Sequence, residues 1–288
     1  MIWFALTVLS AFMFATADAS TKRWFSQSDP WEVVGVRFVW SGLMLAPWVL
    51  AQGFEAPDPR FWIWLCTLAP LDLLAVWFYV RAITSAPLSH TLPWQSFSPV
   101  FSIVTGYVLL GEAVTARGIG GVICVALGAW LLSTTGAGQG GVLAPLRFLW
   151  TERGPRDMLV VALIFSVTSV LGKGALAYMS GARFGPFYAL FLGLFSWIVI
   201  AARGGSVLAA ARREPRGTLV VAGAMAVMIA AHFLAIEHLT VAYMIAVKRT
   251  SMLFGILYGA WLFRERDLAR NLLASAVMLG GVALILIP

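Results

Sequence analysis

The sequence predicts an all-α integral membrane protein. Three observations carry the prediction: long apolar runs, few charged residues, and charges that fall in short segments between the runs. Of the 288 residues, 60% are hydrophobic and 11% are charged, whereas charged residues make up about 25% of a soluble domain. The mean hydropathy is +0.87. Because open strands would leave backbone groups unpaired in lipid, we expect the runs to be helices.

The apolar runs predict ten transmembrane helices, since a helix needs roughly 20 apolar residues to cross a bilayer. The predicted spans are 2–19, 31–51, 61–85, 89–110, 117–135, 157–179, 184–202, 217–239, 241–263 and 268–287.

Charge and metal-ligand spacing argue against several classes of protein. The net charge is +7, but the basic residues lie in short connections and form no separate basic domain, so no nucleic-acid partner is expected. Cys66 and Cys124 lie inside apolar runs, and His90, His232 and His238 show no zinc-binding spacing. We therefore expect neither a metal nor a cofactor.

The longest connection, 136–156, divides the chain into two halves of five spans. Residues 136–141 match the pattern G-x-G-x-x-G, but they follow a membrane span and not a strand, so a dinucleotide site is not expected. The sequence predicts a repeat at 1–135, a linker at 136–156, and a second repeat at 157–288.

The two halves match at a fixed offset of 153 residues, the separation of Glu112 and Glu265. At this offset the following pairs are identical: Ala82 and Ala235, Ile83 and Ile236, Ser98 and Ser251, Phe101 and Phe254, Gly106 and Gly259, Leu109 and Leu262, Ala116 and Ala269, Arg117 and Arg270, and Gly128 and Gly281. Lys22 and Lys173 match at an offset of 151 residues.

Five spans per repeat is an odd number, so the second repeat must enter the membrane inverted. Inverted repeats are typical of secondary transporters, whose substrate site lies near the midplane. The sequence therefore predicts a central cavity between two inverted five-helix repeats and transport by alternating access. No P-loop motif appears, so the energy is expected to come from a solute or ion gradient.

The repeated residues resemble the EamA family of the drug/metabolite transporter superfamily. The resemblance rests on the two five-span halves and on these motifs: Lys22 and Lys173, Ser98-Pro99-Val100-Phe101, Gly111-Glu112 with Arg117, and Glu265 with Arg270. The second repeat departs from the first at Ser251-Met252 and at Arg264, which stands where a glycine precedes the first glutamate.

The resemblance implies a ten-helix exporter of small metabolites with a cavity lined by spans 1, 3, 4, 6, 8 and 9. In size and layout the chain is similar to bacterial exporters of amino acids. We expect a multi-pass protein of a bacterial inner membrane that functions as a monomer. Its expected partners are a small-molecule substrate and the lipid bilayer.

The candidate substrate-binding residues are Tyr79, Trp94, Ser98, His232 and Ser251. Pro93 and Pro99 predict a kink in the fourth span, and carbonyl groups freed at a kink can face a cavity. Trp94 and Tyr79 offer aromatic surface near the kink, while the serines and the histidine offer hydrogen bonds. Ordinary packing is the alternative for each of them.

Asp18, Lys22 and Asp72 are the candidate coupling or gating residues. Asp18 and Lys22 are four residues apart with the acid first, which also suits a local ion pair. Asp72 lies near the middle of the third span, where an ionisable group marks a functional site or a buried partner. Arg37, inside the second span, is expected to anchor helices.

Lys248 and Arg249 lie inside the start of the ninth span, about two turns from its end, and are expected to reach the membrane surface by snorkelling; contact with an anionic substrate is the alternative. Glu112 and Arg117, at a corner between helices, are interpreted as structural.

The basic residues favour one orientation in the membrane. Three of them lie in connections on the side of the N-terminus and twelve on the other side. Because Lys and Arg are enriched in cytoplasmic connections, this difference predicts that both termini are outside. The family resemblance favours both termini inside, so the orientation stays open.

Other functions were weighed against amino-acid export. A multidrug or lipid-linked substrate is the alternative within transport. An intramembrane enzyme would need a nucleophile with its base, or metal ligands, and the sequence contains neither H-E-x-x-H nor G-x-S-x-G. We therefore expect no enzyme.

Overall fold

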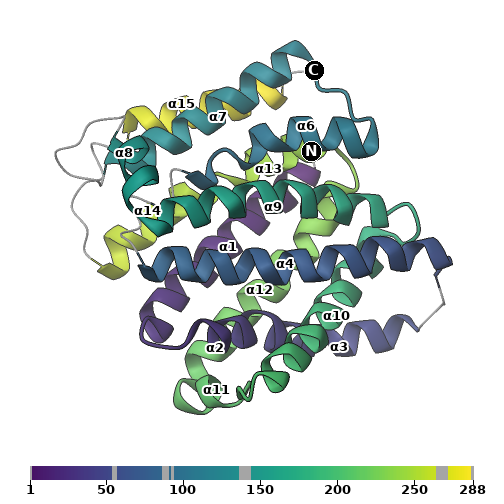
Figure 1. Ribbon diagram of the computed structural model, residues 1–288. Coiled ribbons are helices and arrows are strands. Elements are labelled where there is room, and N and C mark those ends of the chain that lie inside the picture. The colour runs from purple at the N-terminus through teal and green to yellow at the C-terminus, as the bar shows by residue number, and fades with distance from the viewer. Residues whose placement is uncertain are drawn as a thin grey trace. The chain divides into compact units, whose positions relative to one another are not determined.

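The structure is a computed structural model that describes residues 2–53, 57–85, 91, 94–135, 144–263 and 272–286. All regular elements in these ranges are helices (Figure 1). Several residues named above lie outside the described ranges: His90, Pro93, residues 136–141, Arg264, Glu265, Ala269 and Arg270.

Six segments of the described chain are long and apolar enough to cross a membrane. They are α1 (Ile2–Phe25), the segment Pro30–Gln52, α4 (Pro59–Ser85), α9 (Arg153–Ala175), α10 (Gly181–Ala202) and α12 (Pro215–Ile236). Shorter apolar helices are α6 (Ser98–Leu110), α7 (Ala116–Thr135), α14 (Ser251–Phe263) and α15 (Leu272–Leu286), and α13 (Val241–Lys248) precedes α14. Each of the ten predicted spans overlaps one of these helices or a consecutive set, so the all-α fold class is confirmed.

The segment Pro30–Gln52 is not one regular helix. It consists of α2 (Pro30–Val34), a π-helical turn called η1 (Gly35–Val39) and α3 (Trp40–Gln52). The Asp29 side chain accepts a hydrogen bond from the Trp31 backbone N–H at 2.8 Å and so caps α2. A π turn is wider than an α turn and is common at functional sites; this one contains Arg37.

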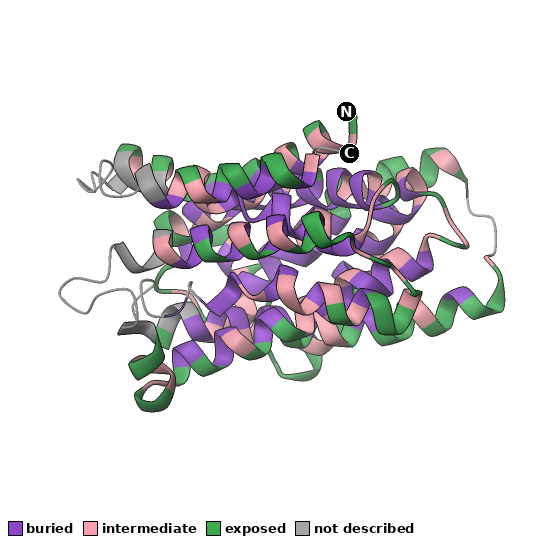
Figure 2. Ribbon diagram, turned by 90° about the horizontal axis from the view of Figure 1, so that it is seen from above, coloured by how far each residue is buried: buried purple, intermediate pink, exposed green. Residues whose placement is uncertain are grey.

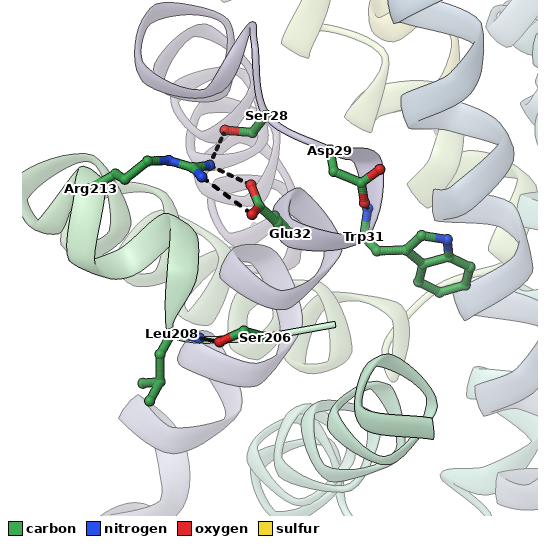
Figure 3. A network of polar contacts seen from close by, with 7 residues as sticks. All are labelled: Ser28, Asp29, Trp31, Glu32, Ser206, Leu208 and Arg213. Atoms are coloured by element: carbon green, nitrogen blue, oxygen red, sulfur yellow. Dashed lines mark hydrogen bonds and ion pairs between the residues drawn. The ribbon is translucent and has the colours of Figure 1, made fainter. Parts of the chain in front are cut away.

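Two short helices lie between the spans. Helix α8 (Ala144–Thr151) falls within residues 136–156, which the sequence predicts as a linker, and α9 begins at Arg153 in the same stretch. Helix α11 (Ala209–Arg213) is tied to α2 by the Arg213 guanidinium, which donates to the carboxylate of Glu32 and to Ser28 Oγ at 3.2 Å (Figure 3).

The outward faces of the helices are largely apolar. Buried and exposed residues alternate around the helix axes (Figure 2), and the exposed residues include large hydrophobic ones. Examples that are at least half exposed are Trp48, Leu50, Ile63, Val108, Trp150 and Trp261. A water-soluble protein avoids wide apolar surfaces, whereas contact with lipid explains them.

The chain forms two compact units. Unit 1 contains Met1–Trp77 and Leu171–His238, and unit 2 contains Phe78–Val170 and Leu239–Pro288. Each unit therefore takes helices from both predicted repeats. The division into repeats at 136–156 concerns the sequence and stays a prediction.

Unit 1 is built on α12, against which α1, α3 and α10 pack. An aromatic cluster fills its core: the Phe184 ring lies 4.7 Å from that of Phe233 and 5.8 Å from that of Phe61, measured between centroids. Phe61 and Phe184 are fully buried.

Unit 2 contains the close pair α7 and α15 and the pair α6 and α13. Helix α6 ends at Gly111, whose φ of +68° is left-handed and suits glycine. The next residue, Glu112, accepts a hydrogen bond at Oε2 from the Val241 backbone N–H at 2.8 Å. Helix α13 therefore begins beside the end of α6. Since the two helices pack together, α13 runs back along α6.

Candidate functional site

The predicted ninth span is broken in unit 2. Helix α13 ends at Lys248 and α14 begins at Ser251, with Arg249 and Thr250 in a turn between them. The Arg249 backbone N–H is shared between the carbonyls of Ile245 at 3.2 Å and Ala246 at 3.0 Å, and the Thr250 N–H donates to the carbonyl three residues before it at 3.0 Å. Thr250 Oγ1 also donates to the Val247 carbonyl at 2.8 Å. Such local bonds compete with the α-helical pattern and favour the break.

Another break lies in the predicted fourth span, also in unit 2. Because it comes earlier in the chain, it is called the first break, and the break between α13 and α14 is called the second break. Trp94 and Gln95 are helical, Ser96 and Phe97 form a turn, and α6 begins at Ser98. Pro99 accounts for the restart, because proline has no N–H to donate and is tolerated in the first turn of a helix. The regular helix is thus interrupted for two residues in this span, while the Phe97 backbone stays in the right-handed helical region.

Polar atoms at the first break are buried without a partner. Trp94, Gln95 and Ser98 are 5%, 3% and 0% exposed. Within the described part of the chain, Trp94 Nε1, Gln95 Nε2 and Ser98 Oγ have no hydrogen-bond partner. Leaving a buried polar group unpaired costs about 1–3 kcal/mol. A solute or water molecule that binds these atoms would recover that free energy, so the three side chains form a candidate binding site.

An aromatic cluster lies beside these polar atoms. The Trp94 ring stacks on Phe97 at 5.8 Å and meets Trp130 of α7 edge to face at 5.2 Å. Phe97 also lies 5.5 Å from Trp130 and 6.3 Å from Phe101 of α6. The site therefore combines apolar aromatic surface with hydrogen-bond donors, which is the usual composition of a small-molecule site.

The second break carries buried cationic side chains. Lys248, Arg249 and Ser251 are 9%, 4% and 7% exposed. Lys248 and Arg249 do not snorkel to the surface as their positions in the sequence predicted, because both are buried inside the protein. Buried charges are stabilised by other polar or charged groups, so the second break is a polar region inside unit 2.

The predicted substrate residues fall in both units. Tyr79, Trp94, Ser98 and Ser251 belong to unit 2, and Tyr79 of α4 is 4% exposed. His232 belongs to unit 1, where its ring meets Phe233 edge to face at 5.0 Å. Within unit 2, Trp94 and Ser98 flank one break and Ser251 follows the other. The assignment of all five to substrate stays a prediction.

The predicted coupling residues all lie in unit 1. Asp18 of α1 forms an ion pair with Arg37, which is 2% exposed in the π turn. Asp72 of α4 accepts a hydrogen bond from the Tyr188 hydroxyl at 2.5 Å. Lys22 is exposed in the last turn of α1. Asp18 and Asp72 thus each join two helices, and their role in coupling stays a prediction.

Sequence reasoning did not select Gln95 or Tyr188 as site residues. Between the two prolines of the fourth span, Gln95 is the only residue with an amide side chain. A polar amide inside an apolar span could therefore have identified it from the sequence. Nothing in the sequence marked Tyr188, because its partner Asp72 lies 116 residues away. Among the described residues, no cluster of three or more His, Cys, Asp or Glu side chains has the geometry of a metal site.

Known proteins resemble this chain in sequence over its first part and in fold over nearly all of it. Residues 1–134 match the model of the EamA-like transporter family. A solved crystal structure matches 99% of this chain and 97% of its own, with a TM-score of 0.75 and 15% sequence identity. At that identity the match shows the fold alone. A comparison with curated proteins finds no match.

The family is one of transporters and not of enzymes, and its match agrees with the apolar helices and the lipid-facing surface described above. The fold match extends over nearly the whole chain. The first 134 residues of this all-helical, multi-pass membrane protein are thus similar to the EamA-like transporter family, and the chain as a whole shares the fold of the matched structure.

Proposed function

We propose that this transporter is a secondary-active exporter of amino acids or related small amphipathic metabolites, and that it works by alternating access in a bacterial inner membrane. The observation that carries the proposal is the set of buried polar atoms without partners at the break before α6. They lie beside the aromatic cluster of Trp94, Phe97 and Trp130. A solute with one polar and one apolar end suits both features.

The proposed site is centred on Trp94 and Ser98, with Ser251 at the second break and Tyr79 on α4 as further contacts. Irregular turns within a membrane-spanning helix are tolerated where they are buried in protein or line a polar cavity. Two such breaks in one compact unit support a binding role. His232 is proposed as a substrate contact of unit 1.

Alternating access is proposed because the sequence repeat has an odd number of spans. Two inverted copies can exchange conformations, so that a site opens to one side of the membrane and then to the other. Because the proposed energy source is a gradient, net export would follow the solute gradient or be coupled to an ion. Asp18, Lys22 and Asp72 are the proposed coupling or gating residues. We propose that a monomer carries out this cycle.

The proposal is tested by counterflow in proteoliposomes that contain the purified full chain. Vesicles loaded with an unlabelled amino acid should accumulate the labelled one, and empty vesicles should not. The panel contains aliphatic and aromatic amino acids, a sugar and a cationic dye, each with and without a pH gradient. Counterflow of amino acids would support the proposal.

Counterflow of the dye alone would replace amino-acid export by multidrug transport. Counterflow of none of the solutes would reject the proposed substrate class. Trp94→Ala should lower counterflow at least ~10-fold, because it removes both an aromatic surface and a donor. Trp48→Ala is the matched control, since Trp48 is 51% exposed on the outer surface, and it should transport at the wild-type rate.

A further inference from the structure

We infer that Gln95 determines specificity in the proposed site, and that its side-chain amide donates hydrogen bonds to a carboxylate of the transported solute. The inference rests on the proposed transport function. It goes further by naming the chemical group that the site selects and a residue that does the selecting.

The unpartnered atoms at the first break are mainly donors. The Trp94 indole N–H can only donate, and Gln95 Nε2 carries two N–H groups. Ser98 Oγ, which can donate or accept, follows one turn later. None of the three atoms has a hydrogen-bond partner in the described ranges. A solute that binds them must bring acceptor atoms, and a carboxylate has two oxygens that accept hydrogen bonds.

The two broken spans contain no acidic residue. Lys248 is 9% exposed and Arg249 is 4% exposed at the second break. Helix α13, which ends at Lys248, runs back along α6 from Glu112. Neither residues 94–110 nor residues 241–263 contain an Asp or a Glu. The two broken spans therefore place no acidic side chain of their own beside the donors, and this suits a carboxylate better than a cationic group.

The aromatic cluster of Trp94, Phe97 and Trp130 would contact the apolar part of the solute. Trp94 contributes its N–H to the donors and its ring to the cluster with Phe97 and Trp130. A carboxylate on Gln95 would leave the apolar part of the solute close to these rings. The selected class is then a small carboxylate with an apolar side group.

A purely structural role for Gln95 makes a different prediction. A glutamine that holds the fold together would bond to protein groups, and its replacement would lower stability. Since Gln95 Nε2 has no such partner among the described residues, an apolar residue of similar length should be tolerated or stabilising. Gln95→Met is that replacement, and Gln95→Asn keeps the amide on a shorter side chain.

The test compares each amino acid with the amine that lacks its carboxylate. Counterflow of L-leucine is measured against isoamylamine, and counterflow of L-phenylalanine against phenethylamine. The wild type should prefer the amino acid in both pairs at least ~10-fold, because a site that bonds a polar group rejects analogues without it. Gln95→Met should reduce that ratio ~10-fold or more, with an unchanged or higher unfolding temperature. Gln95→Asn should restore part of the ratio.

Gln52→Met is the matched control, since Gln52 lies in unit 1 and donates to the Ala182 carbonyl at 3.4 Å. It should leave the ratio unchanged. A wild-type chain that moves no member of either pair overturns the proposed function and this inference with it. A wild type that moves amine and amino acid equally, or a Gln95→Met variant that keeps the ratio, overturns only the inference. A marked loss of unfolding temperature in Gln95→Met also overturns it, because Gln95 would then be structural.

Discussion

Ser98 and Ser251 each begin a helix of 13 residues directly after a break in a transmembrane span. They are 153 residues apart, which is the offset at which the two halves of the sequence match. Both serines are buried. The local causes of the two breaks differ, since Pro99 follows Ser98 whereas Thr250 bonds back to Val247 ahead of Ser251. Different local causes thus produce a break at equivalent positions of the two halves, which indicates that the protein requires a break there.

Gly128 controls the contact between α7 and α15. A Cβ atom on Gly128 would lie 2.5 Å from the Met278 backbone nitrogen, whereas a Cβ on Gly120 of the same helix would meet nothing within 4 Å. Gly128→Ala should therefore push the helices apart and lower stability by about 1–3 kcal/mol. Gly120→Ala should be neutral or slightly stabilising. Thermal unfolding in detergent measures both, and equal midpoints for the two variants would contradict the contact.

Glu112 should stabilise the start of α13. Its carboxylate accepts from the Val241 N–H at 2.8 Å, which satisfies a backbone donor that the helix cannot pair and places negative charge at the helix N-terminus. Glu112→Ala should cost about 1–2 kcal/mol of stability, and Glu112→Gln less, because the amide oxygen still accepts. Hydrogen exchange should be faster at residues 241–244 in the alanine variant. Unchanged exchange there would show that the bond contributes little.

Asp72 gives a direct test of proton coupling. Its carboxylate accepts from the Tyr188 hydroxyl, and Asp72→Asn keeps an acceptor for that hydroxyl but cannot bind or release a proton. We expect folding within about 1 kcal/mol of wild type. If Asp72 carries the proton, a pH gradient will no longer drive uptake in this variant, while counterflow, which moves no net protons, continues. Uptake that still follows the pH gradient would remove Asp72 from the coupling residues.

Tyr188→Phe is the companion variant. It removes the donor to Asp72 and leaves the ring, which packs on Phe184 and Phe233. It should lower stability by about 1 kcal/mol and leave coupling to the pH gradient in place. Loss of coupling in this variant as well would indicate that the pair acts as one unit.

Arg81 and Asp157 join α4 to α9 within unit 2. The guanidinium Nε and Nη2 each donate to one carboxylate oxygen at 2.7 Å. Arg81→Ala or Asp157→Ala should cost about 1–2 kcal/mol, and the double variant should cost little more than either single one. Arg81→Lys should not restore the loss, because lysine cannot make two parallel bonds. Additive losses in a double-mutant cycle would contradict the pairing.

The limits of sequence reasoning are clearest at the charged residues. Spacing suggested Lys22 as a local partner for Asp18 and did not indicate Arg37, which lies 19 residues further on and forms an ion pair with Asp18. Lys248 and Arg249 were expected at the surface and are buried. Local spacing identifies which groups are costly to place in a membrane, but the partner that offsets the cost comes from another helix.

The sequence by itself determined the helical class, the positions of the apolar spans and the repeat offset of 153 residues, because hydropathy and residue identity are properties of short stretches of chain. Only the tertiary structure decided that Asp72 meets Tyr188, that Glu112 begins α13, and that Trp94 lies against Trp130 while its indole N–H has no partner among the described residues. These facts depend on how helices pack side by side. That packing brings together residues more than a hundred positions apart, such as Asp72 and Tyr188, and no local pattern encodes it.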